Sequence, residues 1–197
     1  MVSKVDYKYS SPTDYLLYWI ASKISPILHN LGFIPNDITN LSVLFFLVSM
    51  YFLYHNNIYL GIVFFSLNFF FDCLDGYMAR KYNQVSVFGD WYDHITDFIS
   101  IISITMIIIC KLKSDYKYLL IFIGVILMYL LLKYIGCQQT LLSYNNTYKS
   151  NSLSFTTKLC KYEPHIIKNK LIYLRFFGHG QVLLYGLFLL YLSYKST

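Results

Sequence analysis

Charged residues are scarce in this chain of 197 residues: they make up 13% of it, against about 25% in ordinary soluble domains. Alanine and arginine occur only twice each, and glutamate occurs once. Hydrophobic residues make up 56% and gather into long runs. This composition excludes a secreted disulfide scaffold, a disordered chain and a classical soluble enzyme. It predicts an all-α fold, a polytopic membrane helix bundle.

Cysteine is also sparse, and none of the four cysteines forms a CxxC pair. We therefore expect all four to be reduced packing residues. The first fifteen residues are polar, which argues against a cleavable signal peptide. The net charge of +6 is spread between the apolar runs rather than gathered on one face. That distribution favours contact with anionic headgroups of the lipid bilayer and excludes nucleic acid as the partner.

Two regions are predicted along the chain. Residues 1–36 form a polar tail and an amphipathic helix lying in the membrane interface, with apolar residues every three or four positions from Leu16 to Leu31 and a kink expected at Pro26. Residues 37–197 form the transmembrane domain. Its apolar runs predict five transmembrane helices, the last interrupted around His179, at residues 38–54, 58–80, 87–110, 118–136 and 171–194.

The basic residues predict the orientation. With the N-terminus in the cytosol, twelve lysines and arginines fall on the cytosolic side and four on the other side, which agrees with the positive-inside rule. The polar end of the second span and the start of the third then face the cytosol. Whether the membrane is the endoplasmic reticulum or a bacterial inner membrane stays open.

Acidic residues concentrate at that polar end. Five of the ten lie between positions 72 and 97: Asp72, Asp75, Asp90, Asp93 and Asp97. At 100° per residue, Asp72 and Asp75 share one helix face, and Asp93 and Asp97 share a face on the next span. Two antiparallel helices would bring these faces together, and ionisable groups at such a depth indicate function.

Four converging carboxylates predict a pair of divalent cations. Their mutual repulsion would be strong in a partly dry site, and two hard cations with oxygen ligands would neutralise it. Mg²⁺, Mn²⁺ and Ca²⁺ all suit such ligands. Paired metals beside an arginine, here Arg80, are the usual apparatus for transferring a phosphate ester. Gly76, Ala79 and Gly89 would leave room for a flat ligand against the backbone.

The whole pattern resembles the signature of the CDP-alcohol phosphotransferase family, also called class I CDP-alcohol phosphatidyltransferases. Eight fixed positions match it over 26 residues: Asp72-x2-Asp75-Gly76-x2-Ala79-Arg80-x8-Gly89-x3-Asp93-x3-Asp97. Pro35-Asn36-x2-Thr39 and the interfacial helix before it extend the resemblance to about 100 residues. Family members have six spans, one more than the apolar runs predict here.

The resemblance implies a phospholipid-synthesis enzyme that uses two Mg²⁺ or Mn²⁺ ions. A CDP-linked donor would give its phosphate-bearing group to an alcohol or diacylglycerol acceptor, and CMP would leave. Asp72, Asp75 and Asp93 would be metal ligands, and Asp97 the general base that also touches metal. Gly76, Ala79, Arg80 and Gly89 would line the cytidine diphosphate pocket. A homodimer is also implied.

The residues leave several alternatives open. The stretch after Arg80 favours CDP-diacylglycerol as the donor, whereas Asp93-His94 looks like enzymes that use CDP-choline or CDP-ethanolamine. An intramembrane prenyltransferase and a non-enzymatic ion channel or transporter are more distant alternatives. Asn36 is predicted to cap a helix, with a nucleotide contact as the alternative, and Asn68 to support the metal ligands or to join two helices. We expect Asp90 to be a solvated acidic residue at the start of a helix, and His94 to be a polar neighbour of the cluster rather than a ligand. His179 is expected either to line the acceptor pocket or to lie in a locally flexible segment.

Overall fold

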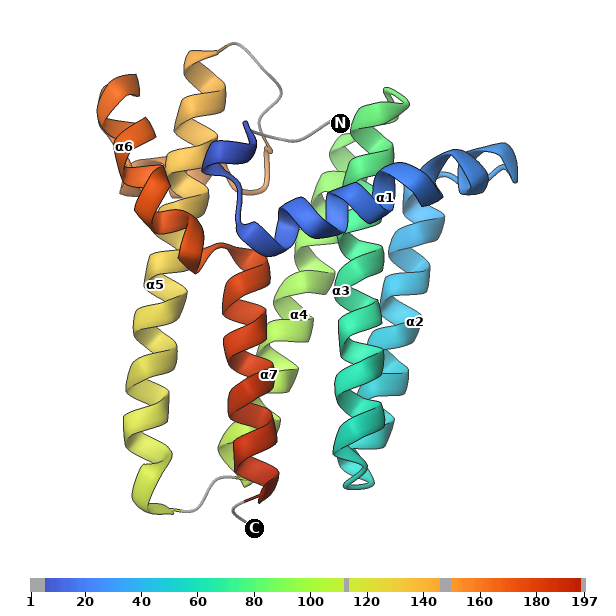
Figure 1. Ribbon diagram of the computed structural model, residues 1–197, viewed down its shortest axis with the longest axis vertical. Coiled ribbons are helices and arrows are strands. Elements are labelled where there is room, and N and C mark those ends of the chain that lie inside the picture. Colours follow the sequence, from blue (N-terminus) through green and yellow to red (C-terminus); the bar gives the residue numbers. More distant parts are fainter. Residues whose placement is uncertain (1–5, 112–113, 146–149, 196–197) are drawn as a thin grey trace.

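The computed structural model describes residues 6–111, 114–145 and 150–195, and its regular elements are all helical. Four long helices, α2 (Pro35–Tyr54), α3 (Ile58–Lys81), α4 (Val87–Lys111) and α5 (Ser114–Tyr144), run roughly parallel to one axis with α7 (His179–Lys195) among them (Figure 1). The helix α1 (Pro12–Asn30) lies across one end of this bundle. The predicted all-α membrane helix bundle, preceded by an N-terminal helix that is not one of the spans, is confirmed.

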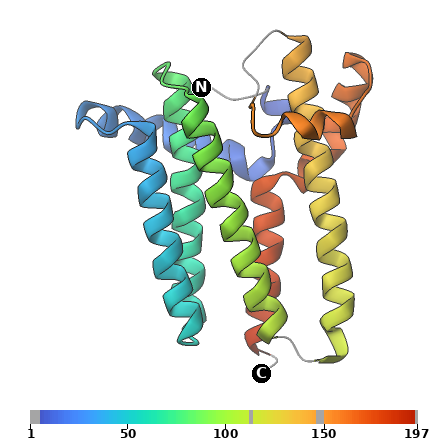
Figure 2. The same cartoon turned by 180° about the vertical axis from the view of Figure 1, so that it is seen from behind.

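Four helices are long and apolar enough to cross a membrane in the described part of the chain, where five spans were predicted. The fifth predicted run, 171–194, is divided: its first residues end α6 (Pro164–Leu174), a turn of 3₁₀ helix follows at Arg175–Phe177, and α7 then begins. Figure 2 shows α7 beside α4 and α5 at the same height in the bundle. The break falls at Gly178, whose extended backbone separates the two helices.

Helices α2 and α3 pack closely along their length, joined by a turn in which Asn56 adopts φ 58°. Ser49 donates a hydrogen bond to the Gly61 carbonyl at 2.8 Å. A side chain at Gly61 would overlap Leu53. Small and polar residues let membrane helices approach each other where apolar burial alone gives little driving force. This close pair fixes the end of α3 against the start of α2.

The end of α5 forms a second packed unit with the 3₁₀ helix Ser154–Leu159 and α6. Cys137 and Cys160, both fully buried, are joined by a disulfide, so the prediction that all four cysteines are reduced was wrong for this pair. Cys73 and Cys110 are free. The stretch 138–168, predicted only as polar, continues α5 to Tyr144 before it folds back. The two bonded cysteines are 23 positions apart in the sequence, and a pairing over that distance leaves no periodic pattern from which it could be predicted.

Gly136 provides a test of this packed unit. A Cβ atom there would overlap the Thr156 backbone carbonyl, which cannot move as a flexible side chain can. We expect Gly136→Ala to destabilise the protein by about 2 kcal/mol, as overpacking typically does, and to lower Tm in detergent by roughly 5 °C. Gly124→Ala, in the same helix with open space around it, is the control and should leave Tm unchanged or slightly higher. Equal Tm values for the two variants would contradict the packing described.

Candidate functional site

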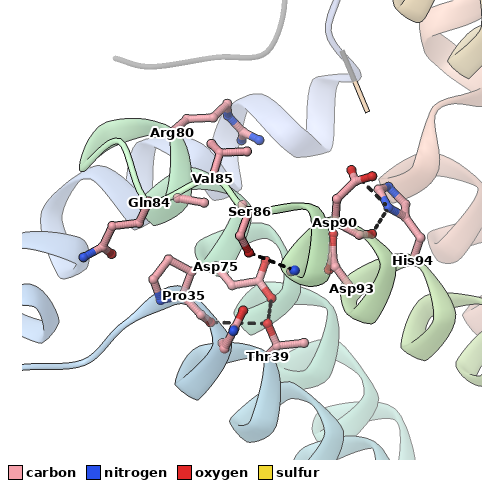
Figure 3. A pocket seen from close by; sticks show the side chains of 14 residues that line it. Pro35, Thr39, Asp75, Arg80, Gln84, Val85, Ser86, Asp90, Asp93 and His94 are labelled. Carbon is pink, nitrogen blue, oxygen red and sulfur yellow. Dashed lines mark hydrogen bonds and ion pairs between the residues drawn. The ribbon is translucent and has the colours of Figure 1, made fainter. Parts of the chain in front are cut away.

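The candidate site lies where the end of α3 meets the beginnings of α2 and α4. A cavity of about 90 Å³ opens there. Seven of the residues predicted as site residues line it: Asn36, Asp75, Gly76, Ala79, Arg80, Gly89 and Asp93. Figure 3 shows Asp75 and Asp93 on opposite sides of this cleft, with Arg80 towards α1. Residues from three separate helices are therefore brought together as the helical periodicity predicted.

Asp75 is the most firmly held of the four signature carboxylates. It is only 3% exposed, and Thr39 of α2 donates a hydrogen bond to its Oδ2 atom at 2.5 Å (Figure 3). A buried carboxylate whose hydrogen-bond donors are neutral still lacks a compensating positive charge. In the described part of the chain neither Asp72, Asp75 nor Asp97 forms an ion pair with lysine or arginine. This donor set fits divalent cations.

The other two predicted ligands lie outside the residues that line the cleft. Asp72 of α3 and Asp97 of α4 group with His179 at the start of α7, and one ligand atom from each lies within 4.8 Å of the others. Asp72 also interacts electrostatically with Asp75 and Asp93. The four carboxylates thus form one connected cluster. Its Asp75 and Asp93 members face the cleft, and its Asp72 and Asp97 members face α7.

The glycines of the signature lie where side chains would intrude. A Cβ atom on Gly89 would lie 3.0 Å from the Ser86 hydroxyl and 3.1 Å from Asn36 Oδ1. A Cβ atom on Gly76 would lie 3.2 Å from the Arg80 guanidinium. Side chains at these two positions would therefore narrow the cleft and press against the residues that line it.

Helix α1 closes the cluster from above. The Arg80 guanidinium lies 5.5 Å from the centre of the Tyr18 ring and donates to its hydroxyl at 3.3 Å. Burial raises the pKa of Tyr18, so this hydroxyl stays protonated. Tyr18 was not among the predicted site residues, because a tyrosine in an amphipathic helix is indistinguishable from an interfacial anchor.

Asp14, an acidic residue in the first turn of α1, was not among the predicted site residues either. Burial raises its pKa to about 6, and the charge of His179 opposes that shift. Its position beside the start of α7 depends on close approach, because a side chain at Gly180 would overlap Thr13 and Asp14. The sequence alone does not reveal that this acidic residue lies close to α7 and to the carboxylate cluster.

Several smaller predictions are corrected. Asn36 was predicted to cap α2, but that helix begins at Pro35 and the Asp37 carboxylate accepts the Ile34 N–H instead. Asn36 faces the cleft, as its alternative assignment required. Asn68 joins two helices by donating to the Ser42 hydroxyl at 2.8 Å.

Asp90 is not a solvated helix-start acid, since its side chain is 7% exposed and accepts the Ser152 N–H at 2.9 Å. His94 Nδ1 lies 2.6 Å from the Asp90 carbonyl oxygen and 2.9 Å from the Ser152 hydroxyl. His94 also lines the cleft, and its assignment as a polar neighbour rather than a ligand stays a prediction. Asp90 and His94 anchor the segment that follows α5, a contact across about 60 positions that the sequence could not reveal.

Comparison with known proteins gives a family. Residues 32–162, about two-thirds of the chain, match the family model described as CDP-alcohol phosphatidyltransferase. An archaetidylinositol phosphate synthase from Pyrococcus horikoshii is 33% identical over 104 residues, covering 53% of this chain and 51% of that protein. A probable CDP-diacylglycerol–inositol 3-phosphatidyltransferase 2 from Arabidopsis thaliana is 28% identical over 117 residues, covering 59% and 50%. This chain thus spans about half the length of these curated relatives, and no solved structure matches it.

Proposed function

Because this chain belongs to the CDP-alcohol phosphatidyltransferase family, we propose that it transfers a phosphatidyl group from CDP-diacylglycerol to an inositol-type alcohol, with release of CMP. The observation that carries this proposal is the cluster of four carboxylates around a cleft that glycines keep open. The names of the relatives support inositol or inositol phosphate as the acceptor.

Each signature residue has a role in this proposal. Asp72, Asp75, Asp93 and Asp97 would hold two Mg²⁺ or Mn²⁺ ions, which supply positive charge to the phosphate oxygens when bound. Gly76, Ala79, Gly89 and Asn36 would receive the cytidine diphosphate, and Arg80 would contact its phosphates. Asn36 and Gly89 approach each other across the cleft, which supports a shared role in nucleotide binding.

The reaction is a displacement at phosphorus. The acceptor hydroxyl oxygen forms a bond to the phosphorus that carries the diacylglycerol group, and the bond from that phosphorus to the CMP oxygen breaks. Asp97 takes the hydroxyl proton as general base. Thr39 holds the Asp75 carboxylate in place, and Tyr18 holds the Arg80 guanidinium.

We further propose that the site faces the cytosol. The ends of α3, α5 and α6 lie at the same end of the bundle as α1 (Figure 1), and most basic residues lie towards this end. Three of the sixteen lysines and arginines lie outside the described residues: Lys4, Lys113 and Lys149. The Cys137–Cys160 disulfide lies at this end too, and full burial shields it from cytosolic reductants. A homodimer and the division into residues 1–36 and 37–197 stay predictions.

CMP release tests the proposed activity. Purified protein in detergent is given Mn²⁺, CDP-diacylglycerol or CDP-choline, and a panel of acceptors: inositol, inositol phosphate, serine, glycerol phosphate and diacylglycerol. We expect CMP with CDP-diacylglycerol and an inositol-type acceptor, and none from the Asp72→Asn variant. CMP from CDP-choline and diacylglycerol would instead assign the amino-alcohol reaction. No CMP from any pair would overturn the enzyme assignment.

Gly76→Leu tests the nucleotide pocket. The leucine side chain would fill the cleft and displace the Arg80 guanidinium. We therefore expect CMP affinity to fall by about tenfold or more, which corresponds to a loss of about 1.4 kcal/mol or more of binding free energy. Isothermal titration with CMP and Mn²⁺ measures the loss. Gly124→Leu, in open space on α5, is the matched control. Unchanged CMP affinity in Gly76→Leu would contradict the pocket assignment.

A further inference from the structure

His179 lies in the carboxylate cluster although it is outside both the eight-position signature and the matched residues 32–162. It is the first residue of α7, more than 80 positions after Asp97 in the sequence. One ring nitrogen lies within 4.8 Å of carboxylate oxygens of Asp72 and Asp97, which come from two other helices. Three helices therefore each place one potential metal-ligand atom in the same small region.

The surroundings of His179 fix its position. The Phe69 ring of α3 meets the imidazole edge-on with 5.0 Å between ring centres. On the other side α1 presses against α7, and side chains at Gly178 or Gly180 would overlap Ser11 and Thr13. Figure 1 shows α1 crossing the bundle where α7 begins. The flanking glycines thus serve close packing rather than flexibility.

Asp14 supplies an independent observation. Its carboxylate interacts electrostatically with His179. Its Oδ1 atom is buried without a hydrogen-bond partner, and the Gly180 backbone and the Ser11 side chain also interact with the carboxylate. Histidines that bind metals usually have a carboxylate or carbonyl partner on the other ring nitrogen, which orients the ring. Asp14 is placed to be that partner.

The spacing also suits a shared ion. Two ligand atoms about 2.1 Å from one octahedral ion are at most about 4.2 Å apart, so the observed group needs only a small contraction to enclose an ion. Imidazole is an accepted ligand for several first-row divalent metals beside carboxylates.

We propose that His179 is a nitrogen ligand to one of the two divalent ions, sharing it with Asp72 and Asp97, and that Asp14 orients its ring. This inference rests on the proposed function, because it assumes that the cluster binds divalent ions. The other ion would then lie towards Asp75 and Asp93. Helix α7 thereby becomes part of the metal site rather than only a wall of the bundle.

Electron spin-echo envelope modulation of the Mn²⁺-loaded full chain in detergent tests the ligand directly, without any activity measurement. We expect modulation from a coordinated ¹⁴N nucleus that changes when histidine is labelled with ¹⁵N. The modulation should disappear in His179→Gln and persist in His94→Gln, the control from the cleft. Mn²⁺ affinity should fall by roughly tenfold or more in His179→Gln, since even outer partners of metal ligands are worth 10–100-fold.

The labelled wild-type protein and His94→Gln suffice if His179→Gln does not fold, because the remaining histidines, His29, His55 and His165, lie away from the cluster. Bound Mn²⁺ without nitrogen modulation overturns the assignment of His179, and CMP release in that case leaves the proposed function standing. Modulation that is lost in His94→Gln but not in His179→Gln also overturns it. Nitrogen modulation without CMP release from any donor would support the ligand and sink the proposed reaction.

Discussion

The Asp97→Asn variant is expected to release CMP about 10²–10⁴-fold more slowly than the wild-type protein, the usual contribution of a general base, while CMP affinity changes little. Asparagine keeps the shape of the side chain and one oxygen but cannot accept the acceptor's proton. Asp97 lies beside Asp72 and does not line the nucleotide cleft. Initial rates at saturating substrate and a CMP titration measure the two effects separately.

Asp37→Asn is the control for this prediction. Asp37 also carries a carboxylate near the site, but it accepts a backbone N–H at the start of α2 and does not line the cleft. Its variant should keep a rate close to that of the wild-type protein. An Asp97→Asn variant that retains the wild-type rate would show that another group removes the proton.

Asp75→Asn should have the second large effect, on ion binding. Two unit charges 4 Å apart interact by about 4 kcal/mol at an effective dielectric constant of 20, so we expect Mn²⁺ affinity to fall by roughly 10³-fold at the site that loses a ligand. The Mn²⁺ affinity is measured from the free-ion signal in a titration followed by electron paramagnetic resonance.

The Thr39→Val variant separates the charge from its placement. Thr39 carries no charge, and its hydroxyl lies 2.5 Å from Asp75 Oδ2 and 3.3 Å from the Pro35 carbonyl oxygen. A supporting partner of this kind is worth about 10–100-fold in metal affinity. The order wild type, Thr39→Val, Asp75→Asn is therefore expected for Mn²⁺ affinity. Wild-type affinity in Asp75→Asn would mean that the ions bind elsewhere or not at all.

The sequence was sufficient where local periodicity decides the outcome. The spans 38–54, 58–80 and 87–110 agree with α2, α3 and α4 to within a few residues, because long apolar runs admit only helices in a membrane. The common face of Asp75, Gly76 and Ala79 follows from 3.6 residues per turn. The cleft between them and Gly89 follows from the short connection between the two helices.

The sequence was insufficient where distant elements meet. The contact of Tyr18 with Arg80 spans 62 positions, and that of His94 with Ser152 spans 58. Nothing in the local pattern distinguishes such residues from interfacial or loop residues. The pairing of Cys137 with Cys160 depends in the same way on how the chain folds back after α5, whereas the break before α7 was predicted from the glycines around His179. His179 was noticed only because two glycines flank it.

Counting the Mn²⁺ ions that bind to the purified full chain shows whether α3 and α4 gather their carboxylates around a pair of divalent cations. We expect two saturable Mn²⁺ sites per chain, which are lost together in the double variant Asp72→Asn/Asp75→Asn. Mn²⁺ binding that is absent in the wild-type protein, or unchanged in the double variant, would contradict this expectation.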